Sequence, residues 1–203
     1  MSKIDWDSMD LAAMYAETPS VVEIARRIGS TPGAVGYHLY KAGVTLTGDK
    51  LRYGCERDKQ ARKAELFVLS QLNGAVDHNA AQFQPKTDVT YRGFRIEVKS
   101  SVLQHRRGQL ILSFMVEKQP HIVDLFVCVG YFNSNDDVPL TVYVIPGHLA
   151  PRWCIKITLT GRSKYERFRI RFPSKLKARV DRELSRLQRE RATCSGSEQA
   201  HGV

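Results

Sequence analysis

The sequence predicts an α/β or α+β fold with a small all-helical module in front of it. Residues 8–43 contain three short helical patterns, and strand-like segments recur from about 75 to 159. One helical pattern precedes these strands at about 58–73, and another follows them at about 174–192. A helix, a set of mixed strands and a closing helix favour a sheet flanked by helices.

Composition and charge narrow the class of protein. The chain has 203 residues, of which 42% are hydrophobic, so it has room for one ordinary domain and a small extra module. A net charge of +10 and a pI of about 9.6 favour a polyanionic partner, with nucleic acid first and an anionic membrane second. No apolar run approaches the roughly 18 residues of a spanning helix, which predicts no membrane-spanning segment.

The cysteines and the N-terminus favour the cytoplasm. The four cysteines are scattered and form no CxxC pair, which predicts free thiols in a reducing compartment and argues against a zinc ribbon. The first ten residues, MSKIDWDSMD, are acidic and lack the pattern of a signal peptide.

The N-terminal helices carry clear start and stop signals. The second is predicted to begin at Ser20, with Glu23 three residues later as a capping box, and to end at Gly29. The third has Thr31 as its N-cap and a proline at its first position. The core of this module is predicted to hold Val22, Ala25, Ile28, Val35 and Leu39.

The stretch VVEIARRIGSTPGAVGYHLYKAGV resembles the helix-turn-helix of many DNA-binding proteins. That resemblance implies that the third helix enters the major groove of double-stranded DNA. The candidate base-contacting residues on its outer face are Thr31, Gly33, Tyr37 and Lys41. The alternative is a small bundle that only contacts other proteins, and the net charge of −2 over residues 1–49 leaves it open.

The positive charge is concentrated near the C-terminus, where residues 162–193 carry twelve Lys or Arg against four Asp or Glu. The candidate phosphate contacts on the last helix are Arg182, Arg186 and Arg189. The alternative is a solvated helix face. The predicted organisation is a helical module at 1–45, a linker at 46–57, a main domain at 58–192 and a disordered tail at 193–203.

The most informative stretch is TDVTYRGFRIEVKSS, residues 87–101. A two-residue turn at Arg92–Gly93 would place Asp88 opposite Glu97 in a hairpin, with Lys99 on the same face. Two adjacent carboxylates repel unless a cation lies between them, and Mg²⁺ prefers such oxygen ligands. The chemistry that this set suits is metal-assisted phosphodiester hydrolysis. The alternative is the ordinary polar face of a sheet.

Asp88 followed eight residues later by Glu97-Val98-Lys99 resembles the motif of the PD-(D/E)xK nuclease superfamily. One departure is Thr87, which stands where the motif has proline. The resemblance implies a restriction-endonuclease-like core, with a mixed central sheet flanked by helices. It also implies Asp88 and Glu97 as ligands of Mg²⁺, which Mn²⁺ can replace, and Lys99 as the catalytic lysine.

The superfamily's first core helix often carries a further glutamate, and this position matches Glu65. The resemblance implies an auxiliary metal or water ligand there. Glu65 lies on an apolar stripe, where burial is costly without a partner. The alternative is that Leu66 and Phe67 face the core and leave Glu65 at its edge.

The segments VDLFVCVGYF and TVYVIP resemble the later strands of the intron-associated homing endonucleases in this superfamily. That narrower resemblance implies a homo-oligomer, either a dimer or a tetramer. The sequence therefore predicts a Mg²⁺-dependent DNA endonuclease with an N-terminal reading module. Two rivals stay open, namely a restriction or junction-resolving nuclease on the same core and a non-catalytic DNA-binding regulator.

Overall fold

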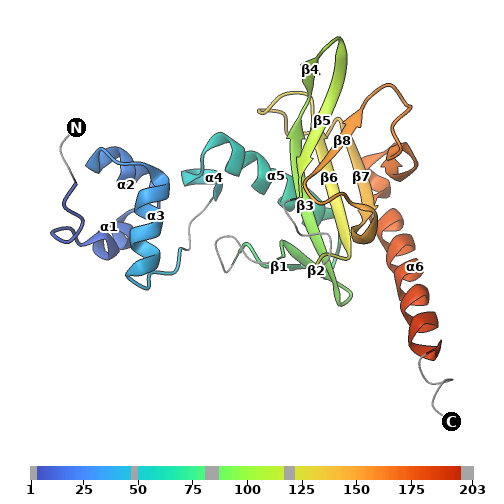
Figure 1. Cartoon of the computed structure of the whole chain (residues 1–203), viewed down its shortest axis with the longest axis horizontal. Coiled ribbons are helices and arrows are strands. Elements are labelled where there is room, and N and C mark those ends of the chain that lie inside the picture. Colours follow the sequence, from blue (N-terminus) through green and yellow to red (C-terminus); the bar gives the residue numbers. More distant parts are fainter. Residues whose placement is uncertain (1–3, 47–49, 81–86, 117–121, 198–203) are drawn as a thin grey trace.

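A six-stranded mixed sheet is the centre of the computed structural model, which describes residues 4–46, 50–80, 87–116 and 122–197 (Figure 1). The strand order is β1-β2-β3-β6-β7-β9, in which β3 and β6 are parallel and the other neighbours antiparallel. The strands are β1 (Val76–Asp77), β2 (Val89–Tyr91), β3 (Phe94–Val102), β6 (Leu125–Tyr131), β7 (Thr141–Pro146) and β9 (Arg169–Ile170). The predicted α+β class with a mixed sheet is confirmed.

A second, three-stranded antiparallel sheet covers one face of the first. It consists of β4 (Gln104–Arg106), β5 (Gln109–Met115) and β8 (Cys154–Thr158), in the order β4-β5-β8. Successive side chains of β6 point to opposite faces of the central sheet, as strand geometry requires. Phe126 and Cys128 pack with β5 and β8, whereas Val127 and Val129 join the cluster beneath the helices.

Two helices cover the opposite face, α5 (Glu56–Gln71) and α6 (Leu176–Ser197). The predicted apolar stripe of α6 is confirmed, because Leu176, Val180, Leu184 and Leu187 are all buried. Helix α6 continues to Ser197 through part of the predicted disordered tail, and residues 198–203 lie outside the described residues. Short 3-10 turns complete the domain at η1 (Gly147–Leu149), η2 (Glu166–Phe168) and η3 (Pro173–Lys175). Within the described ranges, no helix is both long and apolar enough to cross a membrane.

The N-terminal helices α1 (Leu11–Glu17), α2 (Val21–Ile28) and α3 (Pro32–Lys41) form a separate cluster at one end of the molecule (Figure 1). The predicted caps are present. Ser20 Oγ accepts the Glu23 N–H at 3.2 Å, and Gly29 ends α2 with a φ of 69°. The Glu23 carboxylate departs from the predicted capping box, because it pairs with Arg26 at 2.6 Å.

The predicted core of this module is correct except at one position. Ala25, Val35 and Leu39 are buried, and Ile28 packs against them. Val22 is exposed, and Ile24 occupies the core instead. The prediction placed the apolar face of α2 incorrectly because Val22 and Ile24 lie two residues apart, on different sides of a helix.

The segment at 46–57, which the sequence predicts to be a linker, contains secondary structure. Helix α4 (Lys50–Tyr53) occupies part of it, and α5 begins at Glu56. A helix of four residues is too short to show a hydrophobic period, so no pattern in the sequence marks it. This short helix brings Lys50 to the pocket described below.

Candidate active site

The hairpin of β2 and β3 has the predicted turn and register. Arg92 and Gly93 have φ angles of 53° and 79°, as a type I′ turn requires. The pairs Val89–Ile96, Thr90–Arg95 and Tyr91–Phe94 lie opposite each other.

The predicted Asp88–Glu97 ladder pair is not formed, because β2 begins only at Val89. The Asp88 side chain instead accepts the backbone N–H of Val98 on Oδ2 at 2.8 Å. Its Oδ1 accepts from the side-chain amide of Asn79 at 2.9 Å. Two donors therefore fix the orientation of this carboxylate beside β3.

Glu97 is the most unusual side chain of the hairpin, because it is charged and only 4% exposed. Lys99 Nζ donates to its Oε1 at 2.7 Å, as expected for residues two apart on one face of a strand. Its other oxygen, Oε2, is buried and has no hydrogen-bond partner among the described residues. Burial, reinforced by the nearby Asp88 charge, raises the pKa of Glu97 to about 7. An ordinary polar sheet face does not have this arrangement.

Glu65 enters the same region from α5 and is also only 4% exposed. The alternative is half right, because Phe67 packs against the core but Leu66 is 38% exposed and Glu65 is itself buried. Arg62 donates to Glu65 Oε2 at 2.9 Å, and Lys50 Nζ lies 3.7 Å from Oε1. Burial and the Asp88 charge raise the pKa of Glu65, and the two cations oppose that effect.

Sequence reasoning missed the polar residues behind these carboxylates. Asp77 holds Arg62 with both oxygens, at 2.5 and 3.0 Å, and so presents the guanidinium to Glu65. Asn79 lies two residues further along and bridges Lys50 and Asp88. A signal in the sequence was the polar run Asp77-His78-Asn79, which begins within the short strand β1.

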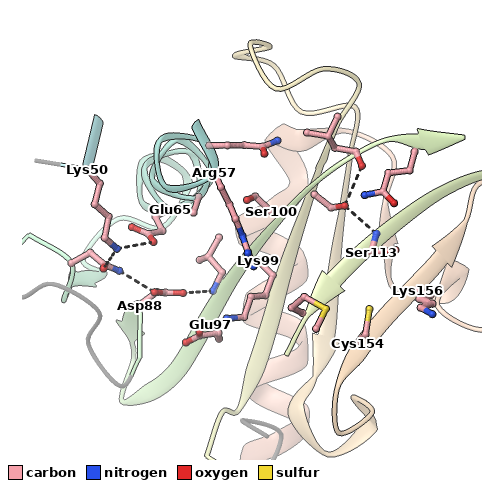
Figure 2. Close-up of a pocket in the computed structure, with 18 of the residues that line it drawn as sticks. Lys50, Arg57, Glu65, Asp88, Glu97, Lys99, Ser100, Ser113, Cys154 and Lys156 are labelled. Atoms are coloured by element: carbon pink, nitrogen blue, oxygen red, sulfur yellow. Dashed lines mark hydrogen bonds and ion pairs between the residues drawn. The ribbon is translucent and has the colours of Figure 1, made fainter. Parts of the chain in front are cut away.

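The four predicted catalytic residues, Asp88, Glu97, Lys99 and Glu65, line one pocket of about 1000 Å³ (Figure 2). The pocket lies between α5, the C-terminal half of β3 and the β4-β5-β8 sheet. Strand β2 pairs with β3 only as far as Ile96, whereas β6 follows β3 to Val102, and this difference in length leaves one edge of β3 open to the pocket. Cationic side chains also line it: Lys50, Arg57, Arg106 and Lys156.

The donor set of this pocket fits a hard divalent cation. Within the described ranges, no group of three or more His, Cys, Asp or Glu side chains is placed to hold a metal. Mg²⁺ does not need such a group, because it is often held by one or two carboxylates, waters and substrate phosphate. The buried Glu97 Oε2 lacks a hydrogen-bond partner among the described residues, and the Asp88 charge acts on the same carboxylate. A cation at this point would give Oε2 a partner and reduce the repulsion between the two carboxylates.

The predicted DNA-contacting residues lie away from this pocket, on two helices. On α3, Thr31, Gly33, Tyr37 and Lys41 are all exposed, although the Thr31 hydroxyl caps the helix by accepting from Ala34 N. On α6, Arg182, Arg186 and Arg189 are exposed, and Arg186 pairs with Glu190 at 2.8 Å. Exposure agrees with a contact role for both sets, and their role stays a prediction.

No protein-family model and no curated protein matches the chain. A solved structure described as that of the bacterial homing endonuclease I-Ssp6803I aligns with a TM-score of 0.41 and 14% sequence identity. The alignment covers 64% of this chain and 95% of that one. This likeness is too weak to bear on function, so the chemistry of this chain follows from the residues of its own pocket.

Proposed function

We propose that the chain is a Mg²⁺-dependent DNA endonuclease of the PD-(D/E)xK type. The observation that carries the proposal is the buried Glu97, whose Oε1 binds Lys99 and whose Oε2 has no partner among the described residues. Burying a carboxylate is costly, and Glu183 on α6 shows that one half-paired buried carboxylate can also occur away from the pocket. What distinguishes Glu97 is that Asp88, Glu65 and Lys99 line the same pocket. A metal-dependent hydrolase needs such a group.

Each carboxylate has a role that its surroundings support. Asp88 and Glu97 would hold the cation, Glu65 would serve as an auxiliary ligand of metal or water, and Mn²⁺ would replace Mg²⁺. When bound, the cation would supply positive charge at the scissile phosphate and lower the pKa of a bound water. Asp88 would keep a fixed orientation, because each of its oxygens already accepts one hydrogen bond.

Lys99 is placed to act on the substrate. Glu97 holds its ammonium at 2.7 Å, and 23% of its side chain is exposed in the pocket. Lysine has three donors, so two remain for an attacking water or a phosphate oxygen. A fixed positive charge at this point would stabilise the charge that develops in the transition state.

The remaining basic surface would hold the DNA. The exposed α3 residues would select the site, and the arginines of α6 would contact the phosphate backbone. We also propose homing activity and assembly as a dimer or tetramer. The sequence resemblance of β6 and β7 to the homing subgroup supports both.

The direct test is cleavage of a randomised double-stranded DNA library, followed by sequencing of the cut ends. We expect cuts with Mg²⁺ or Mn²⁺ and none with EDTA. A non-catalytic regulator would instead retard DNA under both conditions and cut under neither, and this outcome would reject the proposal.

A further inference from the structure

The ammonium of Lys50 reaches the active-site carboxylates from helix α4. Its side chain is 13% exposed, and its Nζ lies 3.7 Å from Glu65 Oε1. The same Nζ donates to the side-chain oxygen of Asn79 at 2.5 Å. Figure 2 shows Lys50 joined to Glu65 by a dashed line, with Asp88 close by.

The chemistry of the three groups fixes how Asn79 is oriented. A lysine ammonium can only donate hydrogen bonds, and an ionised carboxylate can only accept them. The amide oxygen of Asn79 must therefore face Lys50, and its NH₂ must face Asp88. Without Lys50, the Asn79 amide oxygen would lose this donor, and the amide that donates to Asp88 Oδ1 would be held less firmly.

Gly54 holds Lys50 in this place. Its N–H donates to the Lys50 carbonyl at 3.1 Å, which completes the single turn of α4. A Cβ at position 54 would lie 2.4 Å from that carbonyl oxygen and 2.9 Å from Asp58 Cβ. The backbone of α4 would have to move, and Lys50 would move with it.

We propose that Lys50 is a positioning residue of the nuclease centre, which orients Asp88 through Asn79 and pairs with Glu65. Arg62 differs from Lys50, because it binds the other oxygen of Glu65, Oε2, and is held there by Asp77. Lys50 acts through these carboxylates rather than on the DNA. The inference rests on the proposed nuclease function and adds to it a residue that the sequence placed in a linker.

The test compares Lys50→Ala and Lys50→Arg with the matched control Lys59→Ala. Lys59 lies near the start of α5, pairs with Glu56 at 3.0 Å and does not line the pocket. We expect Lys50→Ala to lower the single-turnover cleavage rate by about 10- to 100-fold, the usual cost of removing a group that orients a ligand. DNA affinity should change by less than about twofold if, as proposed, Lys50 acts on the carboxylates and not on the DNA. Lys50→Arg should recover part of the rate, and Lys59→Ala should match the wild type.

A second readout does not depend on cleavage. The side-chain NH₂ signals of Asn79 in an NMR spectrum of the metal-free protein should shift in Lys50→Ala and stay in place in Lys59→Ala. Gly54→Ala should reproduce both the slower cleavage and the shift. In the double variant with Lys50→Ala it should add little, because both changes remove the same interaction.

The outcomes separate this inference from the proposed function. If the wild type cuts DNA and Lys50→Ala cuts at the same rate, this inference is wrong and the nuclease proposal stands. A loss of rate matched by an equal loss of DNA affinity would make Lys50 a DNA-binding residue and would also overturn the inference. If the wild type does not cut DNA at all, both proposals fall. Slower cleavage with unchanged affinity and a shifted Asn79 signal supports the inference.

Discussion

At the scale of single residues, Glu97 determines what the pocket can do. It lies between two apolar residues of β3, and its buried side chain faces both the Asp88 charge and the Lys99 ammonium. The alternation of polar and apolar residues predicted that Glu97 and Lys99 share a face. It did not predict that this face is covered, because coverage comes from β5 and α5, which are distant in sequence.

The first prediction concerns the roles of these two residues. Lys99→Ala and Glu97→Gln should reduce cleavage by at least about 100-fold, because each removes a charge used in the transition state. Affinity for DNA should stay nearly unchanged in Lys99→Ala, and it should rise in Glu97→Gln when metal is absent, since a negative charge facing phosphate is removed. Single-turnover rates and gel-shift titrations measure the two effects.

A matched control is Lys59→Ala, which removes one positive charge from a side chain that pairs with Glu56 and does not line the pocket. It should cut at the wild-type rate. Wild-type cleavage by either Lys99→Ala or Glu97→Gln would show that the site has been assigned to the wrong residues.

The second prediction follows from the pKa of Glu97, which burial raises from 4.5 to about 7. An acid whose pKa is higher in the folded state binds its proton more tightly there than in the unfolded state. The metal-free protein should therefore lose stability as the pH rises from about 4.5 to about 7, by at most about 3 kcal/mol from this group. The raised pKa of Glu65 adds to the loss in the same direction.

Urea unfolding in EDTA at about pH 5 and about pH 8 measures this loss. Glu97→Gln should show a clearly smaller loss of unfolding free energy between the two pH values, because glutamine does not titrate. Added Mg²⁺ should stabilise the wild type more at the higher pH, where Glu97 is ionised, and should do so less in Glu97→Gln. Equal pH dependence in the two proteins would contradict the prediction.

At the scale of elements, features that depend on residues close together in the chain could be predicted from the sequence. Very short elements could not. The caps at Ser20 and Thr31, the Arg92–Gly93 turn and the apolar stripe of α6 each depend on residues that are close together in the chain. Strand β9 and helix α4 have two and four residues, too few to show a period. Because α4 was not predicted, the interactions of Lys50 with Asn79 and Glu65 were not predicted either.

The third prediction belongs to helix α6, whose Arg182, Arg186 and Arg189 are exposed at spacings of four and three residues. Replacing all three with alanine should weaken binding to every DNA sequence alike, because phosphate contacts carry no base information. The slope of log K against log salt should become shallower by about 0.9 for each phosphate that the variant no longer neutralises. Gel-shift titrations over a range of salt concentrations give both quantities.

The control replaces the same three residues with lysine. This variant keeps the charge and should keep most of the slope. An unchanged slope in the alanine variant would mean that this face of α6 is solvated or serves contacts between copies of the chain.

At the scale of the whole molecule, the chain separates a helical module from the sheet domain that holds the pocket (Figure 1). The module has its own core, formed by Leu11, Ile24, Val35 and Leu39 among others. The sequence predicted this division because residues 8–43 contain their own helix caps and enough apolar positions for a small core. It could not predict the two-sheet arrangement of the main domain, since β4, β5 and β8 form a separate sheet only through contacts across the fold.

The fourth prediction tests whether the module reads DNA while the pocket cuts it. Tyr37 is 61% exposed on α3, and Lys41 lies one turn further on the same face. The double variant Tyr37→Ala with Lys41→Ala should leave Mg²⁺-dependent cleavage intact and lower the ratio of rates on cognate and scrambled DNA. A bidentate base contact discriminates by about 1–3 kcal/mol, so the ratio should fall by about tenfold or more. Glu17→Ala, an exposed change on α1 of the same module, should leave the ratio unchanged. If the double variant folds and keeps the full ratio, α3 does not read the site, and the three helices are better explained as a surface for protein contacts.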